Sequence, residues 1–122
     1  MKFAFGDVLA LLPGPPSPHW PEGQRFVDLF RRHDLSLELY APQGHDPQQP
    51  HTRDELYIVA RGQAQFIRGS APQAAVSTAS SCEVSAGDVL FVPAGAPHRF
   101  EDFSDDFVTW VIFYGPNGGE LT

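Results

Sequence analysis

Positive charge and cysteine are two things that this sequence has little of. Only eight of its 122 residues are Lys or Arg, against 15 Asp and Glu, and the formal net charge is −7. Binding to nucleic acid needs a basic face that neutralises phosphates, and electrostatic attachment to an anionic membrane needs the same, so we expect neither partner. The one cysteine, Cys82, cannot form an internal disulfide, which favours a cytoplasmic location.

Long apolar runs are also missing, and no stretch is long enough to span a bilayer. Residues 1–12 are largely apolar, but Gly6 and Asp7 interrupt them, and no small-residue cleavage site follows, so we do not expect a secretory signal. Asp is a good N-cap residue and Pro cannot continue a helix, which predicts a short helix from near Asp7 to Pro13. This helix and a Pro-rich link fill residues 1–24.

The 12 prolines and 11 glycines indicate many short segments joined by tight turns. Short runs of alternating apolar and polar residues predict β-strands, and no amphipathic helices separate them. The spacing of the strands is typical of an all-β sandwich or closed barrel, here one domain over residues 1–122 with a frayed tail at 115–122. The predicted strands are Arg25–Arg31, Leu35–Ala41, Glu55–Ala60, Gln63–Arg68, Cys82–Ser85, Val89–Val92, Pro97–Phe100 and Phe107–Tyr114.

Two segments have alternatives. A helix over residues 26–33 competes with the first predicted strand, because its apolar residues also lie at helical spacing. Residues 69–80, rich in Ala, Ser, Gln and Thr, predict a loosely ordered excursion or a weak edge strand. In the second predicted strand the leucines share one face, and Ser36, Glu38 and Tyr40 share the other.

The segment from Gly87 to His98 has the spacing of a turn, a strand and a reversal. Gly87 allows the turn, the four residues after Asp88 are apolar, and Pro93 with Gly95 reverses the chain. The reversal brings His98 into the interior of the predicted barrel.

A second polar group lies upstream. His51 and Glu55 are four residues apart, so in an extended segment they face the same way, with Arg53 and Tyr57 alongside. The spacing aims an imidazole and a carboxylate into one interior, where His98 would meet them from a different strand.

The upstream segment resembles the first motif of the cupin family. That motif is His, one residue, His, three residues, Glu, six residues, Gly. His51, Glu55 and Gly62 are in register with it, and Gln49 stands at the place of the first His.

The downstream segment resembles the second cupin motif, which is Gly, five residues, Pro, one residue, Gly, two residues, His. Gly87 to His98 fills every position, and Asp102 replaces the Asn that usually follows. The two motifs in order are a strong signal, and the resemblance spans residues 35–114. It implies a small single-domain cupin, a double-stranded β-helix or jelly-roll barrel, with His51, Glu55 and His98 as ligands of one metal ion.

Two imidazoles and one carboxylate make a mixed N/O site that suits one divalent transition metal ion, Fe, Mn, Ni, Co or Zn. The alternative is a barrel that has lost its metal and keeps His51, Glu55 and His98 as satisfied polar residues. A buried carboxylate without a partner is costly, so the presence of Glu55 favours a cation nearby.

Gln49 is the departure from the family motif. Its amide oxygen can ligate the ion, as Gln does at this spacing in type I phosphomannose isomerases, which are similar cupins. The other interpretation is a loop residue whose side chain lies in water. In that case His45 or Gln48, in the same loop, could take its place.

The expected walls of a substrate pocket are aromatic, because a barrel this small must line its cavity with large side chains. We expect Tyr57, Phe91, Phe100 and Trp110 there. Arg53 either holds an anionic substrate near the metal or pairs with an acidic residue at the rim.

The fold does not choose the function. The resemblance implies either a metal-dependent enzyme, of dioxygenase or isomerase type, that acts on a small oxygenated compound, or a non-catalytic module that binds or senses a small molecule. We also expect a homodimer, because Leu56, Ile58 and Ala60 face away from Glu55 and residues 3–12 are more apolar than a monomer needs.

Overall fold

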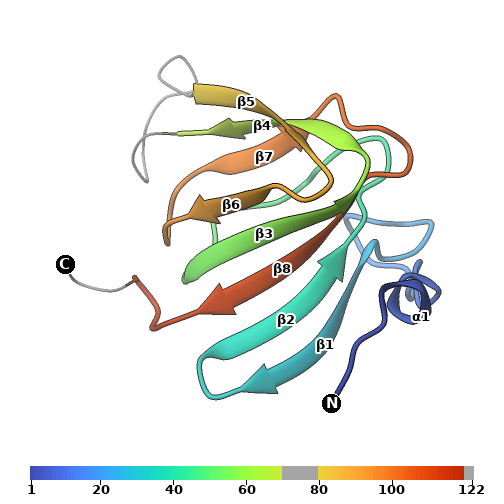
Figure 1. The fold of residues 1–122 in the computed structure, drawn as a ribbon, viewed down its shortest axis with the longest axis horizontal. Helices are drawn as coiled ribbons and strands as arrows, with labels where there is room; N and C mark the ends of the chain where they lie inside the picture. The colour runs from blue at the N-terminus through green and yellow to red at the C-terminus, as the bar shows by residue number, and fades with distance from the viewer. Residues whose placement is uncertain (70–79, 120–122) are drawn as a thin grey trace.

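The computed structural model describes residues 1–69 and 80–119. It confirms the predicted all-β architecture with one short helix (Figure 1). The predicted excursion over residues 69–80 lies, except for its two end residues, outside the described part. The elements are α1 Phe5–Leu9, β1 Phe26–Arg32, β2 Leu35–Tyr40, β3 Asp54–Arg61, β4 Gln63–Arg68, β5 Ser80–Ser85, β6 Val89–Val92, β7 His98–Glu101 and β8 Val108–Tyr114.

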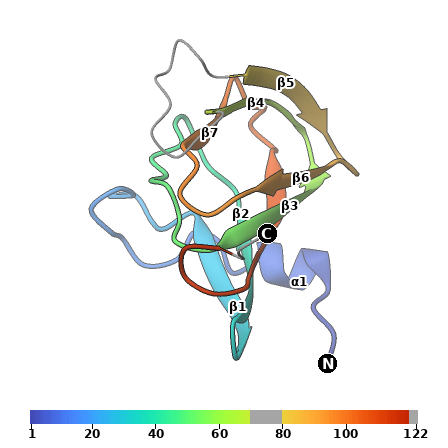
Figure 2. The same ribbon diagram turned by 90° about the vertical axis from the view of Figure 1, so that its left-hand side faces the viewer.

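The strands form two antiparallel sheets. The larger has the order β1-β2-β8-β3-β6 and the smaller the order β5-β4-β7. Figure 2 shows the smaller sheet facing the larger one across the interior. The main core lies between them, where Tyr57 and Val111 of the larger sheet meet Phe66 and Phe100 of the smaller. This is the arrangement of a jelly-roll barrel.

The hairpin prediction for the first two strands is confirmed, and the competing helix is wrong. β1 pairs with β2 from Phe26 opposite Tyr40 to Arg32 opposite Leu35. Two of the residues at helical spacing pack on opposite faces of the strand instead: Phe26 packs on the main core, while Leu29 packs on the other side of the sheet. Tertiary packing on both faces decides the structure here.

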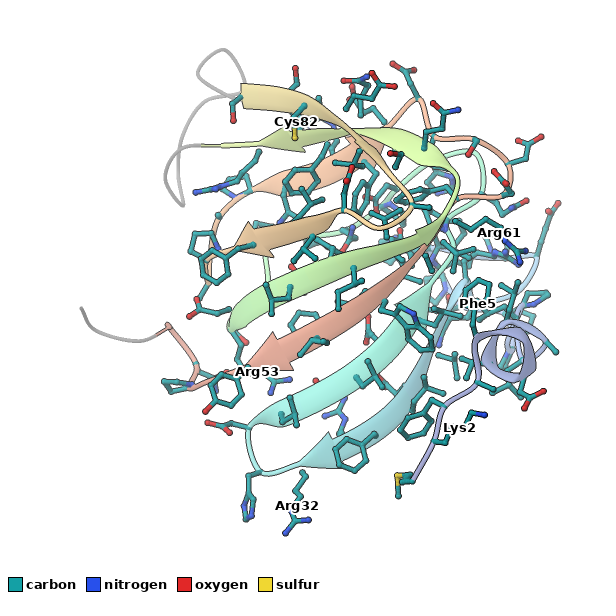
Figure 3. All side chains as sticks on the ribbon, viewed as in Figure 1. Lys2, Phe5, Arg32, Arg53, Arg61 and Cys82 are labelled. Atoms are coloured by element: carbon teal, nitrogen blue, oxygen red, sulfur yellow. The ribbon has the colours of Figure 1, made fainter. Side chains whose placement is uncertain are left out.

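The helix prediction is corrected at its start. α1 begins at Phe5, and its N-cap residue, Ala4, makes no side-chain cap. Packing rather than capping sets this start, because Val8 is buried against the outer face of the larger sheet and the Phe5 ring meets Trp110 edge-on at 6.1 Å. Figure 3 shows Phe5 beside Arg61, whose guanidinium carbon lies 4.9 Å from the ring centroid.

The described part of the tail, residues 115–119, contacts the start of β3. There the Gly118 amide donates to the Thr52 carbonyl at 2.6 Å and the Thr52 hydroxyl donates to Asn117 at 3.0 Å. Residues 120–122 lie outside the described part. Among the described residues no helix has the length and hydropathy to cross a bilayer.

Candidate metal centre

The structure brings together the three side chains that the motifs predict. His51, Glu55 and His98 each offer one ligand atom, and these atoms lie within 4.8 Å of one another. Glu55 stands on β3 in the larger sheet and His98 begins β7 in the smaller sheet, so the group joins the two sheets. The turn at Gly95, with φ of 79°, donates its amide to the His51 carbonyl at 2.7 Å and so fixes one motif against the other.

His98 presents a free lone pair to the site. Its Nδ1 lies 2.9 Å from the Ala96 carbonyl, which can only accept, so Nδ1 carries the proton and Nε2 does not in the neutral ring. Nε2 lies 3.1 Å from Oε1 of Glu55. Two electron-rich atoms at that distance need a proton or a metal cation to hold them together. Burial would lower the pKa of His98, but its close contact with the negatively charged Glu55 carboxylate outweighs burial and raises the pKa.

Glu55 is the group that most needs a partner. It is 1% exposed, and neither of its carboxylate oxygens accepts a hydrogen bond of acceptable geometry. The close approach of His98 therefore counts as an ionic contact rather than a satisfied hydrogen bond. A buried carboxylate without partners is costly, and a divalent cation removes that cost. The donor set and its two orphaned oxygens fit a transition metal ion.

His51 completes the group from the mouth of the site. Its Nε2 lies 3.8 Å from Oε2 of Glu55, and its side chain is 32% exposed. Its ring packs edge-on against Phe113, with the centroids 4.9 Å apart. Burial is the main cause that lowers the pKa of His51, so the ring is neutral and able to bind a metal ion at neutral pH.

Gln48, not Gln49, points its amide oxygen toward this group. The Gln48 oxygen lies 3.2 Å from Nε2 of His51 and accepts from the Tyr57 hydroxyl at 2.8 Å. Gln49 is exposed, at the rim of a cavity. The ligand role predicted for Gln49 is therefore better filled by its neighbour, which the sequence analysis names as a substitute.

Asp46 explains why Gln48 takes this orientation. Its carboxylate accepts from the Gln48 amide nitrogen at 2.8 Å, from the Phe100 backbone at 2.8 Å and from the Tyr40 hydroxyl at 2.5 Å. One carboxylate thus ties the loop before β3 to β2 and β7 and holds the Gln48 oxygen over the site. The sequence signal was an acidic residue two positions before a glutamine, a spacing that favours local side-chain hydrogen bonds.

Tyr57 lies beside the metal-binding group, and Phe100 lies behind it in the core. The Tyr57 hydroxyl is 2.9 Å from Nε2 of His98, and burial raises its pKa well above the ordinary value, so it remains a proton donor. Phe100 packs edge-on against Tyr57, with the centroids 4.9 Å apart, and supports it from the core.

Arg53 lies at the edge of the site rather than in an ion pair. Its guanidinium donates to the Asp34 carbonyl at 2.9 Å and to the Ser36 hydroxyl at 3.1 Å. Its central carbon is 5.4 Å from the Phe113 ring centroid. Figure 3 shows it near the open end of the larger sheet. With these contacts it connects β3 to the β1–β2 turn.

The prediction that Phe91 and Trp110 line the pocket is wrong. Phe91 is 52% exposed, because its neighbour Val92 takes the inward position opposite Glu55. Trp110 faces outward into the cluster beneath α1, while the residues before and after it, Thr109 and Val111, are buried. Both errors come from strand parity, since successive side chains point to opposite faces.

A cavity of about 420 Å³ opens beside His51. A smaller one of about 150 Å³ adjoins it and contains Arg53. Glu38, His51 and Phe113 line both. Tyr40 was expected as a core or pocket residue, but Trp20 and Glu38 were not predicted to lie here. The signal for Glu38 was the polar face that it shares with Ser36 and Tyr40 on β2.

The comparisons with known proteins agree with this fold. The family model of the cupin domain matches residues 36–114. An uncharacterized protein of Streptomyces coelicolor is 32% identical over 93 residues, 75% of this chain and 80% of that protein. A cupin-2 domain containing protein from Shewanella frigidimarina has a TM-score of 0.65 at 18% identity, over 93% of this chain and 94% of its own.

A structure of the DMSP lyases RdDddP and RnDddQII is also similar, with a TM-score of 0.51 and 25% identity over 68% of this chain. This chain spans 38% of the length of that protein. The family match covers more than half of the chain, so the protein belongs to the cupin family.

Proposed function

We propose that this cupin is a metal-dependent enzyme that acts on a small oxygenated compound. The observation that carries the proposal is the apposition of Nε2 of His98 and Oε1 of Glu55 at 3.1 Å, in a place where both oxygens of Glu55 lack hydrogen bonds. A group of satisfied polar residues left from a lost site would not leave a carboxylate unpaired.

His51, Glu55 and His98 would hold one divalent transition metal ion, with Gln48 as a fourth, oxygen donor. The bound ion would act as a Lewis acid on an oxygen atom of the substrate. The Ala96 carbonyl keeps the proton on Nδ1 of His98, so that Nε2 remains a donor atom. The Tyr57 hydroxyl lies close enough to donate a hydrogen bond to an oxygen held at the same point.

The cavity supports an enzyme with a small substrate. At about 420 Å³ it is within the range of ligand pockets, and aromatic side chains wall it. Dioxygenase and isomerase chemistry both fit a site with an open coordination position. The likeness to DMSP lyases, over part of that protein, adds lyase chemistry to the reactions to be tested.

The second candidate is a module that binds or senses a small molecule without reacting. The absence of a third imidazole favours it, because Gln49, which is exposed, stands where the family motif has His. In that case the same cavity would bind a ligand that leaves unchanged.

The test begins with elemental analysis of the purified protein. We expect about one first-row transition metal ion per chain, or uptake of one on reconstitution. The iron-loaded form is then assayed for oxygen uptake, and each metal form for turnover of small hydroxy acids, sugars and DMSP by NMR. Turnover that disappears with a chelator supports the enzyme. Saturable binding of one of these compounds without turnover supports the binding or sensing module. A protein that takes up no metal ion contradicts the metal-dependent enzyme and any module that binds its ligand through a metal ion.

A further inference from the structure

Glu38 is the one carboxylic acid that lines the cavities beside His51 without belonging to the proposed ligand set. It lies on β2, on the inward face that it shares with Ser36 and Tyr40. Both cavities include Glu38, and His51 lines both as well. A substrate bound in either cavity therefore lies beside both this carboxyl group and the proposed ligand His51.

The surroundings of Glu38 favour its protonated form. Burial raises its pKa from 4.5 to about 8, assisted by a hydrogen bond to Asp28 and by the negative charges of Asp28 and Glu55. Asp28 is the cross-strand partner of Glu38 on β1, so the two side chains share a face. Arg31 lies 3.5 Å from Asp28, and its positive charge lowers the pKa of Glu38 by less than the other causes raise it.

The other ionisable groups near Glu38 come from the N-terminal loop, from β2 and from the segment that leads into β3. His51 and Arg53 line the cavities from the segment before and at β3, and His19 does so from the N-terminal loop. Tyr40, two residues along β2, keeps its proton, because burial and the nearby Asp46 raise its pKa. Among these groups Glu38 is the carboxyl group that faces the cavities and can change its charge near neutral pH.

We propose that Glu38 exchanges a proton with a substrate held at the metal centre. This deepens the proposed function and rests on it. In the forward step the O–H bond of the Glu38 carboxyl group breaks as an O–H bond forms on an oxygen of the substrate, leaving a carboxylate. The carboxylate then regains a proton from the substrate or from water in the cavity. Such a group works best when its pKa lies near the working pH.

The experiment uses acetohydroxamic acid as the probe, since it loses one proton when its oxygens chelate a metal ion. Affinity of the zinc-loaded protein for the probe is measured by calorimetry across pH, for wild type and for Glu38→Gln. Carbon-13 NMR of labelled glutamate, assigned by the same variant, gives the pH at which Glu38 ionises in the zinc form. Glu101→Gln is the matched control, because Glu101 pairs with Arg99 on the far side of β7 at 2.6 Å.

Above the pH at which Glu38 ionises, we expect the affinity of the wild type for acetohydroxamic acid to fall relative to that of Glu38→Gln. The fall should be roughly tenfold per pH unit. The protonated acid donates to the bound oxyanion and the carboxylate repels it. Effects of pH on the probe and the metal are common to both proteins and cancel in the ratio. Asp28→Asn should move the onset of this affinity loss to lower pH, because it removes a negative charge next to Glu38. Glu101→Gln should leave the onset unchanged.

The outcomes separate the two proposals. A wild type that binds no metal ion contradicts the proposed function and the role of Glu38 with it. A zinc-loaded wild type whose affinity ratio to Glu38→Gln is flat with pH overturns the role of Glu38 and leaves the metal centre standing. A zinc form that never binds the probe also overturns it, because the ion is then closed to an oxygen ligand from the cavity.

Discussion

The two faces of the larger sheet are built by alternate residues of the same strands, yet they differ in chemistry. On the inward face, β2 and β3 carry Glu38, Tyr40, Glu55 and Tyr57, and two of these are acids. On the outward face, the same two strands and β8 carry apolar residues, Leu37, Leu39, Leu56, Ile58, Trp110 and Ile112. Part of the outward face lies under α1, where Val8, Leu39 and Val108 are buried.

This difference shows how one small barrel can accommodate a costly site. Apolar burial under α1 stabilises the fold without needing any polar partner. The inward face buries Glu55 against His98 of the smaller sheet, and this contact is favourable only with a proton or a cation present. We therefore expect substitutions on the outward face to change stability and those on the inward face to change metal binding.

The largest expected effect is on metal retention, and it concerns His98, which meets the inward face from β7. His98→Ala removes one imidazole from the centre, and we expect it to abolish metal retention measured by elemental analysis. The protein should remain a folded β-protein by circular dichroism. His33→Asn, at the exposed β1–β2 turn where φ is 53°, is the control and should retain the metal. Full retention in His98→Ala would show that the ion binds elsewhere.

The outward face should give the converse result. Leu39 is 0% exposed under α1, so Leu39→Ala should lower the free energy of unfolding by roughly 2 to 5 kcal/mol, measured by denaturant titration. Metal affinity of the folded protein should not change. Leu11→Ala is the control: its side chain is 55% exposed and its loss should cost less than about 0.5 kcal/mol. A loss of metal binding in Leu39→Ala would show that the two faces are coupled.

A finer test compares two neighbouring glutamines. Gln48→Ala should weaken metal binding roughly tenfold, the scale on which residues around a centre act, because it removes the oxygen 3.2 Å from Nε2 of His51. Gln49→Ala should leave affinity unchanged. Competition with a chelating dye measures both. The reverse result would return the ligand role to Gln49 and would mean that the loop rearranges when the ion binds.

The sequence alone predicted the fold and the three central residues, and the reason is periodicity. Glu55 and His98 lie on strands, and the spacing of His51 from Glu55 and of His98 from Gly95 fixes their direction. Gln48 lies in a loop, where no period exists and the direction of a side chain depends on contacts such as those with Asp46. Loop residues could therefore only be named as alternatives.

The wrong prediction that Phe91 and Trp110 line the pocket has a different cause. Parity within a strand says that Phe91 and Val92 face opposite ways, but not which of them faces inward. Pairing decides this: Val92 lies opposite Glu55, and Phe91 lies opposite Leu56. The α1 start was missed for a similar reason, because the contact of Phe5 with Trp110 is tertiary and leaves no local signal.

The uncovered half of the outward face bears on the expected homodimer. Val89 and Phe91 of β6 are 60% and 52% exposed and lie opposite Ile58 and Leu56. A second copy of the chain would cover this apolar surface. We expect light scattering to report a dimer at high micromolar concentration and Phe91→Ser to weaken it with metal affinity unchanged. A monomeric wild type would contradict the expectation.

The last expected effect is on the pH dependence of the free energy of unfolding, and it concerns Glu38 on the inward face. The folded protein raises the pKa of Glu38 from 4.5 to about 8, mainly through burial. Between these values the folded state binds the proton more tightly than the unfolded state. The stabilisation from Glu38 is therefore complete below about pH 4.5, decreases as pH rises, and is lost above about pH 8.

In Glu38→Gln, which has no ionisable group at this position, this decrease should be absent. Denaturant titration of the metal-free wild type and variant, compared pH by pH, isolates the contribution of Glu38 from those of other groups. Parallel curves between pH 4.5 and 8 would show that Glu38 ionises as it does in the unfolded chain.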